Sequence, residues 1–268
     1  MTKLLITCVA ENNPEFHFRV ITLFKTLQKF GGSLATAKLI ANFVNNIDPK
    51  IYIQLKNMGV SVRIVKPYDK RLQRHCNKIR MLEIDEEYDV LIALDCDTAV
   101  TRDFSSEIST NNIRRCDSLL DPLKIHQWEY LYNYFNLAMP LSENEIHANS
   151  AILFIPQKYV KDLRDAWLYY SYMVNDCFYS NDNWKEIGHH KYFTDQFALS
   201  LALAHQRINV ELLPAEFNIH INDSYSNWAN HLHPYILSYH HNVTENWKLK
   251  TTGMIVPDQY IKRVNSIL

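Results

Sequence analysis

Short apolar runs alternate with segments of helical periodicity along the first hundred residues of the chain. The apolar runs predict strands over residues 3–10, 37–44, 60–65 and 88–94. The segments between them predict helices over residues 14–30, 48–58 and 77–84. Because strand and helix take turns, we expect a mostly parallel sheet with right-handed crossovers.

The second half of the chain has a less regular pattern. Strands are expected over residues 116–120, 147–155, 210–213 and 235–239. Helices are expected over residues 128–137, 156–175 and 194–205. Neither an internal repeat nor a Pro/Ser-rich linker divides the sequence. We therefore expect residues 1–268 to form a single domain.

One apolar run ends in two acidic residues. Residues 88–94 are nearly all apolar, and Asp95 and Asp97 follow directly. Such a run is typical of a strand buried on both faces of a parallel sheet, and ligands bind beyond the carboxyl ends of such strands. Two carboxylates there can hold a hard divalent cation, and that cation can hold a diphosphate. The alternative is a solvated turn that the two aspartates cap.

Composition narrows the class of protein. The chain is 47% hydrophobic and 12% aromatic, which suits a buried core and argues against disorder. A net charge of −1 argues against nucleic-acid binding. The chain has only 5 glycines and neither G-x-x-x-x-G-K nor G-x-G-x-x-G, so we expect neither a P-loop nor a classical dinucleotide fold.

Cysteine usage and hydropathy suggest a compartment. The 5 cysteines form no C-x-x-C pair, which favours buried thiols in a reducing environment. The first ten residues are too short for the apolar core of a signal peptide, and no run of about 18 apolar residues predicts a transmembrane segment. We expect a cytoplasmic protein.

Five segments of the chain carry a common pattern, at residues 77–82, 88–97, 149–155, 193–199 and 213–218. Together they resemble the GT-A-fold, nucleotide-sugar-dependent glycosyltransferases, and look closest to glycosyltransferase family 8 and its relatives. The segment 88–97 is similar to their "YD-apolar-LD-x-D", and Asn149-Ser150-Ala151 to their "N-S-G", with Ala151 where glycine is usual. Residues 77–82 are similar to the family's helix before the D-x-D strand. Residues 193–199 are similar to the start of its "DQ" helix, and residues 213–218 to its "LP-x-x-[YF]-N" segment. The resemblance covers roughly residues 3–250.

The resemblance implies a fold and a reaction. The fold would be α/β of the GT-A (Rossmann-like) kind, with a mostly parallel central sheet flanked by helices and a smaller acceptor-side subregion. Residues 1–100 would form the nucleotide-sugar-binding half and residues 101–268 the acceptor-side half. The reaction would be metal-dependent transfer of a sugar from a nucleoside-diphosphate sugar to an acceptor. The acceptor (carbohydrate, lipid or protein) and the oligomeric state stay open.

The resemblance also implies a metal site. In the family, the D-x-D pair binds Mn²⁺ or Mg²⁺, which neutralises charge on the leaving diphosphate. Here Asp95 and Asp97 would be ligands, with a histidine near the C-terminus as a third, for which we expect His240 rather than His241. The family's "H-x-x-G-x-x-K-P-W" lacks its Gly and Pro here, and Lys248 stands where a phosphate-contacting lysine would be. A surface pair of histidines is the alternative.

Four further residues are expected to bind the donor. Glu11 and Asn12 follow the first strand, where the resembled fold contacts the base and ribose, although the alternative is a helix cap at Asn12 or Asn13 before Pro14. Lys78 and Arg80 are the candidate cations for the diphosphate. Helix periodicity aims only one of them at the edge of the sheet, and the other would lie on a solvated face.

The reaction centre is expected at Asp195 and Gln196, with Asn149 holding sugar hydroxyls. In an inverting enzyme Asp195 would be the general base, and in a retaining enzyme it would orient the donor sugar and stabilise positive charge on the anomeric carbon. The alternative is that Asp195 only caps a helix. The aromatic run over residues 128–135 could form an acceptor platform or fill the core.

Two other functions remain open. A nucleotidyltransferase that makes sugar nucleotides would use a similar sheet and acidic metal ligands, but it would normally carry a Gly-rich loop where this chain has residues 10–14. A non-catalytic sugar-nucleotide-binding protein is the third possibility. The presence of Asp95, Asp97 and Asp195 together favours the transferase.

Overall fold

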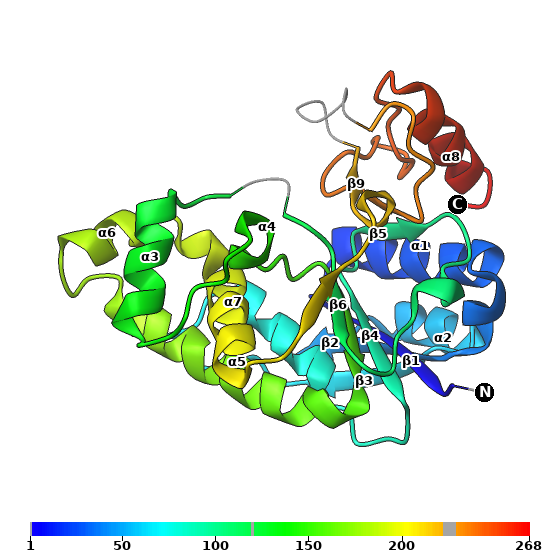
Figure 1. Ribbon diagram of the computed structural model, residues 1–268. Coiled ribbons are helices and arrows are strands. Elements are labelled where there is room, and N and C mark those ends of the chain that lie inside the picture. Colours follow the sequence, from blue (N-terminus) through cyan, green and yellow to red (C-terminus); the bar gives the residue numbers. More distant parts are fainter. Residues whose placement is uncertain (1, 119–120, 222–228) are drawn as a thin grey trace.

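The computed structural model describes residues 2–118, 121–221 and 229–268 (Figure 1). Within them a seven-stranded sheet has the order β3-β2-β1-β4-β7-β6-β8. The first four strands along the chain are mutually parallel: β1 (Leu4–Ala10), β2 (Lys38–Val44), β3 (Ser61–Val65) and β4 (Val90–Leu94). The predicted parallel α/β sheet is therefore confirmed.

Helices cover both faces of this sheet, which explains why its central strands are continuously apolar. Ile6 and Ile92 pack with α1 (Pro14–Phe30) and α2 (Pro49–Asn57). Their neighbours in sequence, Leu5 and Leu91, point to the other face. That face is covered by three elements, η2 (Arg74–Leu82), α5 (Gln157–Cys177) and α7 (Thr194–Gln206).

The remaining strands of the large sheet make it mixed. β7 (Ile152–Pro156) runs antiparallel to β4, and β6 (Ile113–Arg115) runs antiparallel to β7. β8 (Val210–Leu212) closes the edge, parallel to β6. β7 places Asn149 and Ser150, which precede it, next to the end of β4, because antiparallel neighbours begin where their partners end.

A second, three-stranded sheet carries the C-terminal part of the site. It has the order β5-β10-β9, with β5 (Thr98–Val100), β9 (Ile219–His220) and β10 (Ile236–Ser238). This sheet and α8 (Ile255–Asn265) form a lobe above α1 (Figure 1). β5 follows Asp97 and pairs with β10, so the residues after β10 lie beside Asp97.

Several sequence predictions need correction. The segment predicted as a helix over 77–84 is a 3₁₀ helix over Arg74–Leu82, and the strand predicted over 116–120 is instead Ile113–Arg115. Residues 119–120 of that prediction lie outside the described residues. In the aromatic run, Trp128 and Tyr132 fill the core at 1% exposed each, whereas Tyr134 is 48% exposed.

Short elements complete the description. The helices not yet given are α3 (Ile125–Tyr134), α4 (Glu143–Ile146) and α6 (Asp182–Gly188), and the 3₁₀ helices are η1 (Gly32–Thr36), η3 (Ser105–Glu107), η4 (Lys191–Phe193) and η5 (Ala215–Phe217). All five cysteines are buried free thiols. Among the described residues, no helix is both long enough and apolar enough to cross a bilayer.

Candidate functional site

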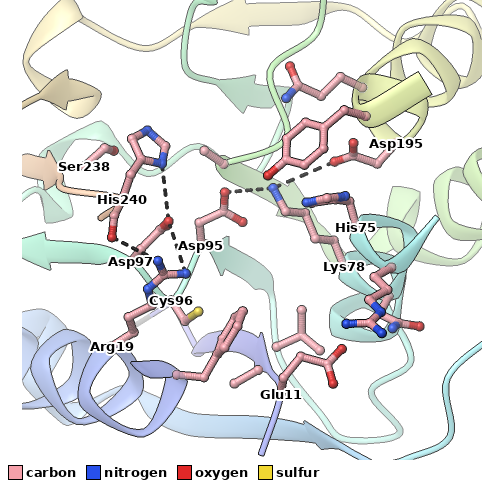
Figure 2. Close-up of a pocket in the computed structure, with 18 of the residues that line it drawn as sticks. Glu11, Arg19, His75, Lys78, Asp95, Cys96, Asp97, Asp195, Ser238 and His240 are labelled. Atoms are coloured by element: carbon pink, nitrogen blue, oxygen red, sulfur yellow. Dashed lines mark hydrogen bonds and ion pairs between the residues drawn. The ribbon is translucent and has the colours of Figure 1, made fainter. Parts of the chain in front are cut away.

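A cavity of about 600 Å³ opens at the carboxyl ends of β1 and β4. In the order β3-β2-β1-β4, the first three strands lie side by side in reverse sequence order and β4 lies on the other side of β1, so the order of the strands reverses between β1 and β4. Open α/β sheets bind ligands at such switch points. The cavity is lined by the end of β1, the turn after β4, η2, the start of α7, the end of β10 and His240 (Figure 2). Residues far apart in the sequence meet there.

Lys78 connects the end of β4 to the start of α7. Its ammonium lies 2.7 Å from Asp95 Oδ2 and 3.7 Å from Asp195 Oδ2 (Figure 2). Ser150 Oγ donates to Asp195 Oδ2 at 2.7 Å, which completes the cluster. Burial opposes the charge on Lys78, but the two carboxylates outweigh it and raise the pKa of the ammonium above its usual value. Lys78 therefore stays a cation in the cavity.

The Asp195 side chain lines the cavity and does not cap α7. The N-cap of α7 is Phe193, and no side chain caps the first turn. The Asp195 carboxylate is 2% exposed, and Trp167 Nε1 donates to the Asp195 backbone carbonyl at 2.6 Å. A rigid carboxylate beside a cation can act on a reacting group in front of it.

Asp97 forms a second cluster with His240 and Arg19. His240 Nδ1 lies 3.3 Å from Asp97 Oδ2, and Arg19 Nη1 lies 3.8 Å from the same oxygen. Arg19 Nη2 also donates to the His240 backbone carbonyl at 3.0 Å (Figure 2). Although burial raises it, the hydrogen bond from His240 and the charges of His240 and Arg19 hold the pKa of the Asp97 carboxyl below its usual range.

The backbone at His240 is unusual. Its φ is +44°, in the left-handed region that non-glycine residues rarely adopt. The hydrogen bond with Asp97 raises the pKa of His240, and His240 Nε2 lies 3.0 Å from His220 Nδ1. Conformations of this kind cluster at functional sites, because surrounding contacts must hold them.

The donor atoms around Asp97 fit part of a metal site. Adjacent ligands of a small divalent ion are roughly 3 Å apart, and Asp97 Oδ2 and His240 Nδ1 are 3.3 Å apart. The Asp95 carboxylate is turned toward Lys78, and among the described residues no group of three or more His, Cys, Asp or Glu side chains could hold a metal ion. These residues fit an ion that takes further ligands from a bound diphosphate, as Mg²⁺ commonly does.

Glu11, Asn149 and Gln196 also line the cavity. Asn149 Oδ1 accepts from the backbone N–H of Ala151 at 2.8 Å, so its side-chain amide is held at the start of β7. Glu11 lies at the opposite end, after β1. The structure thus brings both halves of the expected site to one cavity.

Three expected residues lie outside the cavity lining. Arg80 pairs with Glu83 at 2.7 Å, so Lys78 is the η2 cation that faces the cavity. The Lys248 ammonium donates to the Asn265 backbone carbonyl at 2.8 Å. Asn12 donates to Asn46 Oδ1 at 2.7 Å. The cap of α1 is Asn13, which accepts from the backbone N–H of Phe16.

Sequence reasoning missed several side chains of the cavity, among them Arg19, His75, Tyr192 and His220. Arg19 is 6% exposed, although helix periodicity alone would place a charged residue on the solvent side. His220 stands two residues after Asn218, just beyond the segment 213–218 that carries the family pattern. Tyr192 adjoins the "DQ" segment, and that position was its only signal.

Comparison with known proteins shows the fold. No protein-family model and no curated protein matches the chain. Solved structures do match, and one is the apo WbbM bifunctional glycosyltransferase, with a TM-score of 0.60 and 12% identity over 98% of this chain and 50% of that one. An active-site mutant of LgtC matches with a TM-score of 0.59 and 12% identity, over 98% of this chain and 94% of that one. Apo mouse xyloside xylosyltransferase 1 matches with a TM-score of 0.52 and 12% identity, over 90% of this chain and 98% of that one. The chain spans about half the length of WbbM. At this identity the likeness shows the fold alone, and that fold is the GT-A fold of glycosyltransferases.

Proposed function

We propose that this GT-A-fold protein is a metal-dependent glycosyltransferase that moves a sugar from a nucleoside-diphosphate sugar to an acceptor. The observation that carries the proposal is the Lys78 bridge, 2.7 Å from Asp95 and 3.7 Å from Asp195. It joins the acidic strand end, where a diphosphate would bind, to the carboxylate where chemistry would occur. Both ends lie in one cavity of about 600 Å³, a size typical of ligand sites.

The donor would lie along the cavity from β1 to α7. Glu11, Ala10 and Val44 line the end suited to the base and ribose. Lys78 would donate to the diphosphate, because a buried ammonium that stays charged can exchange a carboxylate partner for a phosphate oxygen. Residues 1–100 would thus form the donor half, and residues 101–268 would supply the acceptor side.

Asp97 and His240 would hold Mn²⁺ or Mg²⁺. When bound, the ion would act as a Lewis acid toward the leaving diphosphate. Asp97 is ready for this role, because its low pKa keeps it ionised at neutral pH. His240 would bind the ion as neutral imidazole, in place of its hydrogen bond to Asp97.

Asp195 and Asn149 would serve the reacting sugar. Asn149 would hold sugar hydroxyls through its amide. If transfer inverts the anomeric centre, Asp195 would take the proton of the acceptor hydroxyl as that oxygen bonds to the anomeric carbon and the bond from this carbon to the diphosphate breaks. If transfer retains the configuration, the same carboxylate stabilises positive charge on that carbon while the bond to the diphosphate breaks.

The rival functions have less support. After β1 the chain has Glu11 and Asn12, and Asn13 caps α1, so the Gly-rich loop of a nucleotidyltransferase has no counterpart here. A non-catalytic binding protein would have no use for a buried carboxylate such as Asp195, at 2% exposed, beside the donor site. The five free thiols support a reducing compartment, and we propose the cytoplasm.

A screen of nucleoside-diphosphate sugars tests the proposal. We expect at least one of them to be hydrolysed slowly with Mn²⁺, and EDTA to stop the reaction. Water stands in for the acceptor in this assay, so the acceptor need not be known. If no nucleotide sugar bound or reacted with either metal, the proposed function would be rejected.

A further inference from the structure

An exposed aromatic side chain stands at the mouth of the cavity. Tyr192, in η4, is 63% exposed and lines the cavity three residues before Asp195. Its ring centroid lies 4.0 Å from that of His75, with the planes tilted by 59°. An exposed aromatic ring in the wall of a cavity offers an apolar face on which a bound ligand can pack.

The Tyr192 ring rests on a rigid base. It packs edge-on against Phe193 at 5.8 Å, and Phe193 lies 6.4 Å from the buried ring of Phe197 in α7. η4 runs directly into the helix that carries Asp195. The exposed ring is therefore fixed relative to the reaction centre, as a binding platform must be.

The position of Tyr192 favours the acceptor over the donor. The donor groups named above are more deeply placed, since Lys78 is 16% and Asp195 2% exposed. The Tyr192 ring, at 63% exposed, is far more accessible than either, so a second substrate that arrives from solvent can reach it. Sugar rings present apolar C–H faces, and such faces pack well on aromatic rings.

A second cavity adjoins the first. It measures about 300 Å³ and shares Arg74 and Asn77 with the first. Arg74 is exposed, and within the described ranges it has no ion-pair partner, whereas Lys78, Arg80 and Arg71 each have one. A guanidinium between two cavities can donate to hydroxyl or acidic groups of a ligand that passes from one to the other.

We infer that Tyr192 and His75 form an acceptor subsite for a pyranose ring, and that the cavity beyond Arg74 receives the next sugar of an oligosaccharide acceptor. The role of this subsite in holding an acceptor rests on the proposed function, whereas sugar binding is inferred from the contacts and exposure of Tyr192 and His75 alone. The acceptor is thereby a carbohydrate rather than a protein side chain or a simple lipid alcohol.

Saturation-transfer NMR tests the inference. The probes are the methyl glycosides of the common hexopyranoses and of their disaccharides, added to the whole protein with Mn²⁺ and a nucleoside diphosphate. Tyr192→Ala should weaken glycoside binding by about tenfold, whereas Tyr192→Phe, which keeps the ring, should stay within about threefold. Tyr179→Ala is the matched control: Tyr179 is 75% exposed and lines neither cavity, so binding should not change.

Arg74→Gln tests the second cavity. It should remove the preference for disaccharides over monosaccharides and leave monosaccharide binding intact. Absence of glycoside binding by the wild type, or unchanged binding in Tyr192→Ala, would overturn the subsite. If glycosides bind as expected but no nucleotide sugar does, the sugar site stands and the glycosyltransferase proposal falls.

Discussion

At the scale of single residues, the site depends on how burial fixes a few charged groups. Arg19 and His240 are 221 positions apart, yet they meet at Asp97. The sequence indicated Asp95, Asp97 and Asp195 because each follows or opens a regular apolar pattern. It could not indicate Arg19 or His220, because only tertiary packing decides that these polar groups face a cavity.

Asp195→Asn should lower turnover by at least about a hundredfold and leave donor affinity within a few fold. A group that acts on the acceptor or the anomeric centre contributes mainly in the transition state. Donor affinity by calorimetry and turnover by diphosphate release check this. Asp182→Asn is the control, because Asp182 lies in the first turn of α6 with its side chain 96% exposed. Equal kinetics in the two variants would rule out a catalytic Asp195.

His240→Ala should weaken Mn²⁺ binding more than His241→Ala. His240 lies 3.3 Å from Asp97, whereas the His241 side chain is 81% exposed and pairs with Glu15. The Mn²⁺ dissociation constants of both variants, measured with a nucleoside diphosphate present, decide the matter. A larger loss in His241→Ala would reverse the assignment.

At the scale of elements, the sequence predicted the parts whose burial is uniform. β1, β2 and β4 were predictable because both of their faces are covered, whereas β3 is a partly exposed strand at the edge of the sheet. α5 was predictable from its apolar face, and α7 from an apolar run that is buried over residues 197–203. The short elements η2 and β6 differ from the prediction, since segments this short take their form from their neighbours. α8 was missed because only Pro257, Ile261 and Val264 of its residues are buried.

Lys78 should also stabilise the packing of η2 against β4 and α7. Lys78→Met leaves Asp95 and Asp195 buried without their cation, so the free energy of unfolding should fall by about 3–5 kcal/mol. Urea denaturation measures this. The control is Lys185→Met: Lys185 is 58% exposed in its pair with Asp182, and such surface pairs contribute less than about 1 kcal/mol. Similar losses in both variants would mean that the buried ion pairs of Lys78 stabilise the fold no more than a surface ion pair does.

At the scale of the whole molecule, donor binding should couple to stability. A nucleoside diphosphate with Mn²⁺ at about 100 times its dissociation constant should add roughly 2.7 kcal/mol, because it binds only the folded state. That corresponds to a rise in Tm of several degrees. EDTA should reverse most of the rise. Melting curves that no common nucleoside diphosphate shifts would argue against a donor site at the end of β4.

The central claim is that the cavity catalyses metal-dependent cleavage of a nucleotide sugar, and the most direct measurement is diphosphate release by the wild type and by Asp97→Ala. Asp97 is 15% exposed and pairs with His240 and Arg19, so the variant should lose some stability but stay folded, which circular dichroism checks before release is compared. We predict Mn²⁺-dependent release by the wild type, none with EDTA, and at least about a thousandfold less from Asp97→Ala. Near-normal release by a folded Asp97→Ala, or release that EDTA leaves unchanged, would contradict the account.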